Sequence, residues 1–355
     1  MKISTEIVVP VHDQSRPIRR AVESLLRDPE TAPLIIAHNI DPSVLDLPQD
    51  ERIRIEKLDG FAGRPGACFD AGIAAAKAKW VGIMGSDDWY EPGALEAMRR
   101  HAIQDKADGV IAPQKHQLQL NNQIKPLSLR QKNLQAARDR MFYRTAPLGI
   151  FKRDMLAEST YKFGPEFPAG SDMRVTALLW TSGRRFSYYW NDPAYVVGKD
   201  AKTRVTFTPR PLAESGAPYV ALLKEPQVKD FDKKTRHSLA VKMVRVHVLG
   251  AVVLRPSADR WQPGDFEWLQ NYLQTLISYD PTCYRALSLR DQRIIWAIKD
   301  GNLQDVLTAN ASWKRANMRE RIFPRGYVAA LTEKDSNLRW AFATGVRRLM
   351  SGKVR

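Results

Sequence analysis

Cysteine is scarce in this sequence: Cys68 and Cys283 are the only two among 355 residues. Two thiols predict neither a framework of disulfides nor a zinc site built from thiolates. Long apolar runs are missing too, since the best candidate, residues 241–254, is interrupted by two basic residues and a histidine. It falls short of the roughly 20 apolar residues that span a bilayer, and the N-terminus lacks the apolar core of a secretory signal. We therefore expect a cytoplasmic protein.

The common glycine-rich phosphate-binding motifs do not fit either. The loop at residues 60–66 (GFAGRPG) is rich in glycine, but its spacing matches neither the P-loop nor G-x-G-x-x-G. A P-loop NTPase and a Rossmann dehydrogenase are therefore not supported.

Positive charge is what the sequence has in excess. Its net charge is +16, with 44% hydrophobic and 26% charged residues, as is typical of a soluble globular protein. Residues 210–355 carry 25 basic and 14 acidic residues, a net charge of +11, against +5 for residues 1–209. A basic half of this size suggests a polyanionic partner, namely nucleic acid, an anionic membrane surface or an anionic polymer. The alternative is a solvated helical surface that is simply basic, and on charge alone this is the more common explanation.

Residues 1–112 alternate short apolar strands with amphipathic helices. The expected strands are residues 4–11, 34–38, 52–57, 80–85 and 109–112. The expected helices are residues 16–27, 67–79 and 92–103. This alternation predicts an α/β domain with a mostly parallel sheet and right-handed crossovers.

The pattern changes twice further along the chain. Residues 115–141 are rich in Gln, Asn, Lys and Arg, which favours a long surface excursion, either a mobile lid or an inert insertion. Prolines punctuate residues 211–232, which we expect to be a linker, and helical periodicity dominates residues 233–355. We therefore expect an N-terminal α/β domain over residues 1–210 and a smaller, basic helical region after the linker.

The most informative segment is residues 80–89 (WVGIMGSDDW), an apolar run of strand length that ends in Asp87 and Asp88. Acidic groups at the carboxyl end of a parallel strand face a ligand crevice. Carboxylate oxygens in that place suit Mg²⁺ or Mn²⁺, which can hold a diphosphate. The alternative is a polar turn, because Ser-Asp-Asp also favours loops and a helix is expected to begin at Pro92.

Four motifs, in this order, resemble those of the family 2 glycosyltransferases, which have the GT-A fold. They are the strand end VPVHD, the loop and helix GRPGACFDAGIAAAKAKW, the acidic GSDDW and the later FPAGSDMRV. The similarity covers roughly residues 3–207. It implies an N-terminal GT-A domain and an enzyme of the type that builds bacterial cell-surface polysaccharides or teichoic acids.

The resemblance also implies two separate acidic sites. Asp87 matches the last carboxylate of the family's Asp-X-Asp motif and is the expected ligand of Mn²⁺ or Mg²⁺, with Asp88 either compensating as a second ligand or capping the turn. Gly85 stands where the family often has the first aspartate. Asp172 matches the general base, which accepts the proton of the acceptor hydroxyl. Its alternative role is to cap a helix.

The expected donor-binding residues lie in the loops of the same motifs. They are Pro10, His12, Asp13, Asn39, Asp41, Arg64, Asp70, Ser86, Lys202 and Arg204. Several of these positions also have an alternative role without any ligand. His12 could be an unliganded histidine at a strand end, which is the more common role of a lone histidine, Asp70 an exposed helix residue, and Lys202 and Arg204 plain surface charge.

Taken with the resemblance, these residues predict an inverting glycosyltransferase. Its donor would be a nucleotide-diphosphate sugar, most simply a UDP-sugar, and its acceptor a glycan, an anionic glycopolymer or a lipid-linked saccharide. The basic region would hold that acceptor or contact the inner face of the plasma membrane; nucleic acid is not expected, and a homo-oligomer remains open. The alternatives are a sugar nucleotidyltransferase and a non-catalytic polyanion-binding protein on a degenerate GT-A scaffold.

Overall fold

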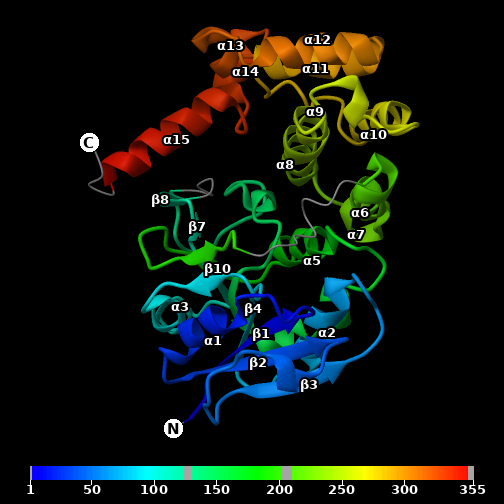
Figure 1. Ribbon diagram of the computed structural model, residues 1–355. Coiled ribbons are helices and arrows are strands. Elements are labelled where there is room, and N and C mark those ends of the chain that lie inside the picture. The colour runs from blue at the N-terminus through cyan, green and yellow to red at the C-terminus, as the bar shows by residue number, and fades with distance from the viewer. Residues whose placement is uncertain (1, 124–128, 201–209, 351–355) are drawn as a thin grey trace. The chain divides into compact units, whose positions relative to one another are not determined.

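The structure is a computed structural model of the chain and describes residues 2–123, 129–200 and 210–350. It divides into two compact units. The α/β unit comprises residues 1–135 and 144–208, and the helical unit comprises residues 136–143 and 209–355. In Figure 1 the chain of the α/β unit runs from blue to green, and the long C-terminal part of the helical unit runs from green to red.

A seven-stranded sheet forms the centre of the α/β unit, in the order β10-β6-β9-β4-β1-β2-β3 (Figure 1). Its strands are β1 (Thr5–Val11), β2 (Thr31–His38), β3 (Arg54–Leu58), β4 (Trp80–Ile83), β6 (Gly109–Ile111), β9 (Gly149–Lys152) and β10 (Phe186–Tyr188). β9 runs antiparallel to β4 and β6, and the other neighbouring pairs are parallel. The predicted α/β fold with a mostly parallel sheet is therefore confirmed.

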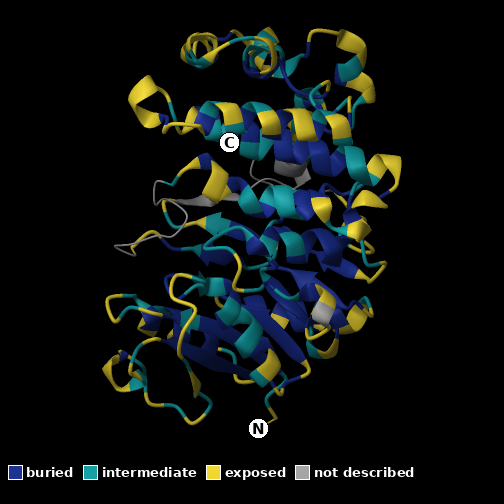
Figure 2. Cartoon of the chain, turned by 90° about the vertical axis from the view of Figure 1, so that its right-hand side faces the viewer, coloured by how far each residue is buried: buried dark blue, intermediate teal, exposed yellow. Residues whose placement is uncertain are grey.

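Helices cover both faces of this sheet. They are α1 (Ile18–Leu26), α2 (Pro65–Ala75), α3 (Ala94–Gln104), α4 (Arg153–Leu156) and α5 (Ser171–Trp180). Side chains alternate along β1, so Ile7 and Val9 enter the core shared with α1 and α3, whereas Val8 faces α2. A Cβ on Gly72 of α2 would lie 2.2 Å from Cγ1 of Val8, so only glycine permits this approach. Most strands of the sheet are accordingly dark blue in Figure 2, whereas the edge strand β3 is largely exposed.

A second, four-stranded sheet extends the α/β unit, in the order β5-β11-β7-β8. Its strands are β5 (Trp89–Tyr90), β11 (Tyr195–Val197), β7 (Gln114–His116) and β8 (Gln119–Gln123). β5 directly follows the acidic segment and pairs with β11 in antiparallel orientation. This pairing fixes the acidic segment at its far end. β7 and β8 occupy part of residues 115–141, the segment expected to be a surface excursion.

Helices make up most of the described part of the helical unit. They are α6 (Leu212–Lys224), α7 (Pro226–Lys229), α8 (Lys233–Met243), the π-helix η5 (Val244–Val248), α9 (Leu249–Val253), α10 (Asp265–Tyr279), α11 (Leu289–Asp300), α12 (Leu303–Trp313), α13 (Met318–Ile322), α14 (Tyr327–Thr332) and α15 (Asn337–Met350). Single 3-10 turns lie at Met141–Tyr143 and Ala258–Arg260 of this unit, and at Pro42–Val44 and Ser159–Tyr161 of the α/β unit. Among the described residues, none of these helices has both the length and the apolarity that a bilayer span requires.

Residues 211–232, expected to be a linker, are largely helical. Pro211 is the N-cap of α6, and Pro226 is the first residue of α7. Proline suits the first turn of a helix because its missing N–H has no partner to lose there. Pro211 and Pro226 thus lie at helix starts, whereas Pro218 lies inside α6. The two units meet in the sequence just before this segment, between Thr208 and Pro209.

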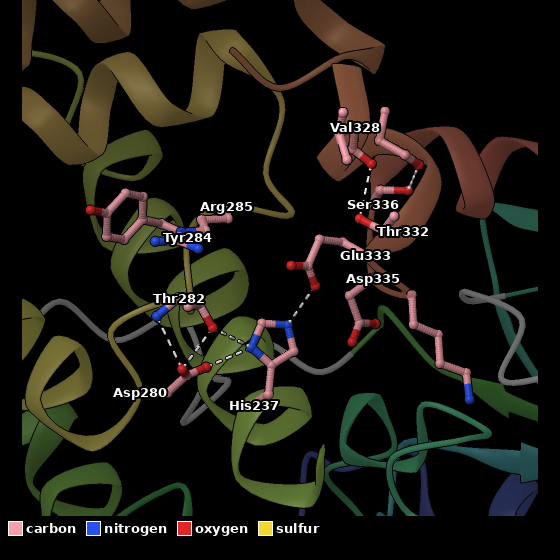
Figure 3. A network of polar contacts seen from close by, with 12 residues as sticks. His237, Asp280, Thr282, Tyr284, Arg285, Val328, Thr332, Glu333, Asp335 and Ser336 are labelled. Atoms are coloured by element: carbon pink, nitrogen blue, oxygen red, sulfur yellow. Dashed lines mark hydrogen bonds and ion pairs between the residues drawn. The ribbon is translucent and has the colours of Figure 1, made fainter. Parts of the chain in front are cut away.

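A charged network holds the helical unit together around His237 of α8 (Figure 3). Its Nδ1 lies 2.6 Å from Oδ2 of Asp280, and its Nε2 lies 3.0 Å from Oε2 of Glu333. Burial by itself would lower the pKa of His237, but the two carboxylates outweigh burial and raise the pKa to about 10. Below that pH the imidazolium therefore joins α8 to the turn after α10 and to the residue after α14.

Candidate active site

The candidate site lies at the carboxyl edge of the large sheet. Because β1, β2, β3 and β4 are parallel, the loops that follow them emerge at the same edge. These loops contain most of the expected site residues, from His12 after β1 to Asp88 after β4. The topology thus brings together residues from four distant parts of the sequence.

Asp88 holds the acidic loop in shape. The hydroxyl of Tyr195 donates a hydrogen bond to its Oδ2, and the backbone N–H of Gly198 donates to its Oδ1 at 2.8 Å. The same hydroxyl accepts a hydrogen bond from the N–H of Gly85 at 3.1 Å. Burial and the Asp88 carboxylate raise the pKa of Tyr195 well above its usual value, so the phenol keeps its proton and can donate. Both oxygens of Asp88 are thus engaged by the protein.

Asp87 contacts two arginines, Arg16 just before α1 and Arg20 in the first turn of α1. Nη2 of Arg16 lies 3.2 Å from Oδ1 of Asp87, and Nε of Arg16 donates to the hydroxyl of Ser86 at 3.0 Å. Arg20 donates from Nη2 to the backbone carbonyl of Asp87 at 2.8 Å. Its guanidinium carbon also lies 4.1 Å from the ring centroid of Trp89. The side chain and the backbone of Asp87 are therefore held by different arginines.

The donor set at Asp87 fits a sparse metal site. The described residues contain no group of three or more His, Cys, Asp or Glu that could hold a metal ion. Magnesium sites at nucleotides commonly use only one or two protein carboxylates and complete their coordination with phosphate oxygens and water. Asp87 fits this pattern, whereas the geometry of Asp88 is that of a turn-stabilising residue.

The residues after β1 form a tight turn. Oδ1 of Asp13 accepts the N–H of Ser15 at 2.8 Å, and its carbonyl accepts the N–H of Arg16 at 3.2 Å. The hydrogen bond from Ser15 lowers the pKa of Asp13. Partial burial and the guanidinium of Arg16 lower the pKa of His12, which favours a neutral imidazole. In this arrangement Asp13 shapes the turn that carries Arg16, and Pro10 is the next-to-last residue of β1.

The loop after β2 is joined to the glycine-rich loop after β3. Asn39 donates from Nδ2 to the carbonyl of Gly60 at 2.9 Å and accepts the N–H of Gly60 at 2.8 Å. His38 contacts the same carbonyl through Nε2 at 2.6 Å. Asp41 caps a short 3-10 turn by accepting the N–H of Ser43 at 3.0 Å, which lowers its pKa. Asn39 and Asp41 therefore shape this part of the edge.

The glycine-rich loop lies against the start of α5. A Cβ on Gly66 would lie 2.2 Å from the carbonyl oxygen of Gly164 and 3.1 Å from Oγ of Ser171. Asp70 of α2 accepts the N–H groups of Phe163 and Gly164 at 2.9 and 2.8 Å. Nη1 of Arg64 donates to the carbonyl of Glu166 at 3.2 Å. Arg64 and Asp70 thus fix the segment that leads to the second acidic site.

Asp172 lies in the first turn of α5 and is partly exposed. Gly170, with φ of 83°, is the N-cap of the helix, so Ser171 and Asp172 are its first two residues. Thr176 donates to the backbone carbonyl of Asp172 at 3.0 Å, which secures the backbone of this turn. The close approach of Gly66 to Ser171 places this turn beside the glycine-rich segment that follows β3.

The sequence model of the Glycosyl transferase family 2 matches residues 6–159. Residues 6–159 are a family 2 glycosyltransferase domain. The succinoglycan biosynthesis protein ExoO of Rhizobium meliloti (strain 1021) is 32% identical over 110 residues, which are 30% of this chain and 31% of that protein. The chain thus spans about a third of the length of this relative.

Two other comparisons extend beyond the family 2 domain. The poly(ribitol-phosphate) beta-N-acetylglucosaminyltransferase TarP of Staphylococcus aureus (strain N315) is 22% identical over 235 residues, which are 63% of this chain and 71% of that protein. The crystal structure of S. aureus TarS 1-349 in complex with UDP-GlcNAc has a TM-score of 0.70 at 13% identity. The match covers 88% of this chain and 92% of that chain. At this identity the likeness shows a shared fold, which includes the helical region.

Two expected donor-binding residues, Lys202 and Arg204, lie outside the described residues. Four residues that sequence reasoning missed hold the acidic loop of the family 2 domain: Arg16, Arg20, Tyr195 and Gly198. The two arginines had a signal in the sequence, since they lie one helical turn apart at the start of the helix that follows the first strand. Tyr195 and Gly198 had none.

Proposed function

We propose that this protein is an inverting, metal-dependent glycosyltransferase that moves a sugar from a UDP-sugar to a hydroxyl of a glycan acceptor. The observation that carries this proposal is that Asp87 follows β4 at the carboxyl edge of the sheet, while the start of α5, which carries Asp172, lies against the glycine-rich segment that follows β3. TarP is named an N-acetylglucosaminyltransferase, and TarS was crystallised with UDP-GlcNAc. An N-acetylhexosamine is therefore the first donor sugar to test.

At the donor end, Asp87 would hold Mn²⁺ or Mg²⁺ together with the donor diphosphate. When bound, such an ion neutralises the negative charge that develops on the departing nucleotide. Ser86 and Arg16 lie next to Asp87 and are placed to bind phosphate oxygens. Asp88 and Tyr195 keep the loop in position while the bond to the sugar breaks.

At the acceptor end, Asp172 would act as the general base. It accepts the hydroxyl proton as the acceptor oxygen attacks the anomeric carbon from the face opposite the nucleotide, and the configuration inverts. Ser171 stands where the family has the first residue of a Glu-Asp pair, so a single carboxylate carries this step. Arg64 and Asp70 support it indirectly, because they fix the segment before α5.

The acceptor is proposed to be an anionic glycopolymer or a lipid-linked saccharide of the cell surface. Acids of the last helices are engaged internally: Glu320 pairs with Arg293 at 2.6 Å, and Glu333 pairs with His237 at 3.0 Å. Arg319, Arg325 and other basic side chains there are exposed. A basic surface of this kind would hold phosphate groups of the acceptor or of the inner face of the plasma membrane. We accordingly propose a cytoplasmic, peripheral enzyme.

A panel of nucleotides tests the proposal by Mn²⁺-dependent thermal stabilisation. Preferential stabilisation by UDP is the expected result, with release of UDP from a UDP-sugar confirming donor turnover. Asp87→Ala should abolish the Mn²⁺-dependent part of this stabilisation. A preference for nucleoside triphosphates would indicate nucleotidyl transfer instead, and polyanion binding without any nucleotide effect would indicate a non-catalytic scaffold.

A further inference from the structure

We propose that Arg16 is a built-in counter-ion of Asp87 that makes divalent-cation binding depend on the donor. The inference rests on the proposed function, because it concerns the same carboxylate and the same diphosphate. It adds a role for a residue that lies outside the recognised acidic motif, some 70 residues earlier in the chain.

The first step is the geometry of the pair. Arg16 and Asp87 are 3.2 Å apart at Nη2 and Oδ1, and their side chains are only 13% and 10% exposed. A second contact, from Nε of Arg16 to Ser86 at 3.0 Å, fixes the plane of the guanidinium beside the carboxylate. The turn built by Asp13 aims Arg16 at this point. A pair so shielded from water is screened weakly by salt.

The second step is the charge balance around that pair. Asp88 has its two oxygens on Tyr195 and Gly198, so its carboxylate stabilises the loop. A divalent ion at Asp87 would have to take up its position beside a guanidinium that already neutralises the carboxylate. The divalent cation and the positively charged guanidinium of Arg16 would repel each other. Without the donor, cation binding at Asp87 is therefore opposed.

The third step is what the donor changes. A nucleoside diphosphate brings negative charge to the loop and offers a guanidinium the planar, two-point contact that arginine forms with phosphate. Arg16 can then turn from Asp87 to the phosphates, and the carboxylate becomes a cation ligand. Donor and cation thus favour each other, and linkage requires the effect to be reciprocal.

The fourth step is that the loop does not depend on Arg16 for its backbone. Arg20 holds the carbonyl of Asp87 at 2.8 Å. Gly198 packs against the same carbonyl so closely that a Cβ there would lie 1.8 Å from the oxygen. The side chain of Arg16 can therefore move, or be replaced, while Asp87 keeps its position.

The experiment is a titration with Mn²⁺, followed by the electron paramagnetic resonance of the free ion, with and without UDP. Without UDP, wild type should bind Mn²⁺ weakly. With UDP, the affinity for Mn²⁺ should rise at least about tenfold. In Arg16→Met, Mn²⁺ alone should bind about tenfold more tightly than to wild type, and the effect of UDP should shrink by a similar factor. Arg16→Lys keeps the charge and should retain weak binding of Mn²⁺ alone.

Arg19→Met is the matched control, because Arg19 lies on the same helix and pairs with the exposed Asp46. It should behave as wild type. A structural defect would weaken Mn²⁺ binding, so tighter binding in Arg16→Met separates the proposed role from simple damage. Unchanged Mn²⁺ affinity in Arg16→Met, with UDP still bound, overturns the inference and leaves the transferase proposal intact. If UDP binds neither to wild type nor to Arg16→Met, the proposed function fails, and the inference fails with it.

Discussion

The carboxylate of Asp88 occupies the space that a side chain at Gly85 would need. A Cβ at position 85 would lie 2.7 Å from Oδ2 of Asp88. The family often has an aspartate at position 85. In this chain the carboxylate of Asp88 lies where the side chain of that aspartate would begin. The loop keeps a carboxylate there, and Tyr195 and Gly198 hold it.

Restoring the family's aspartate should therefore harm this protein. Gly85→Asp places a Cβ and a second carboxylate against Asp88, which should cost about 1–3 kcal/mol through overpacking, besides the repulsion between like charges. We expect a lower melting temperature and slower release of UDP from the donor. Gly250→Ala is the control, since a Cβ there meets nothing within 4 Å and alanine favours the helix. Higher activity in Gly85→Asp would show that position 85 is open to a ligand.

Tyr195 should matter for the donor as well as for stability. Tyr195→Phe removes the hydroxyl that serves both Asp88 and the N–H of Gly85, and each buried polar group left unsatisfied costs about 1–3 kcal/mol. Tyr189→Phe also removes a hydroxyl bonded to an acid, Asp105, at 2.8 Å. Thermal unfolding and Mn²⁺-dependent UDP binding, measured for both variants, distinguish their effects. Both variants should melt earlier, but only Tyr195→Phe should bind UDP more weakly.

The fold was predictable from local patterns where those patterns repeat. Alternating apolar strands and amphipathic helices predict the parallel part of the large sheet, because each unit is encoded within about 30 residues. β2 begins at Thr31, three residues before the predicted start at Leu34, and includes Pro33, a residue that local patterns do not favour in a strand. The small sheet was missed, since it joins a two-residue strand, Trp89–Tyr90, to Tyr195–Val197. No local periodicity encodes a pairing over that distance.

In the candidate site, too, local motifs were predictable from sequence and distant contacts were not. Asp87, Asp88 and Asp172 stand in short motifs whose chemistry is readable from sequence, and their catalytic and metal roles stay predictions. The partners that orient the acidic loop could not be read, because Arg16 reaches it from about 70 residues away and Tyr195 from about 110. Such contacts are set by tertiary packing. Sequence therefore indicated the acids but not the groups that decide what each acid can do.

Asp172 should be needed for transfer and not for donor binding. Asp172→Asn keeps the shape of the side chain but cannot accept the acceptor's proton, so transfer should fall by about a hundredfold or more. UDP affinity should stay within about twofold of wild type, because the donor contacts lie on other loops. Asp154→Asn, at an acid whose side chain is 85% exposed, is the control. Near-normal turnover in Asp172→Asn would rule out this residue as the base.

The helical unit should lose stability at high pH through His237. The pKa of about 10 in the folded protein lies above the unfolded value of 6.5, so the folded state binds the proton more tightly. The resulting stabilisation is fully present below pH 6.5 and is lost as the pH rises toward 10. Each unit by which the pKa rises on folding adds at most about 1.4 kcal/mol to the free energy of unfolding. The actual contribution is smaller, because solvent near the partly exposed ring weakens the interaction. Urea unfolding followed by tryptophan fluorescence should thus show a lower midpoint at pH 9.5 than at pH 6.

His237→Gln should abolish most of that difference, because a neutral amide can still donate a hydrogen bond from its nitrogen but gains no charge at any of these pH values. His116→Gln, at an exposed histidine of the α/β unit, should unfold as wild type does at both pH values. Nucleotide binding should be retained in both variants, since the candidate site is built from the loops after β1 to β4 of the α/β unit and neither His237 nor His116 lies in them. If wild type and His237→Gln lose stability equally between pH 6 and pH 9.5, then the network in Figure 3 does not act as a charged clamp.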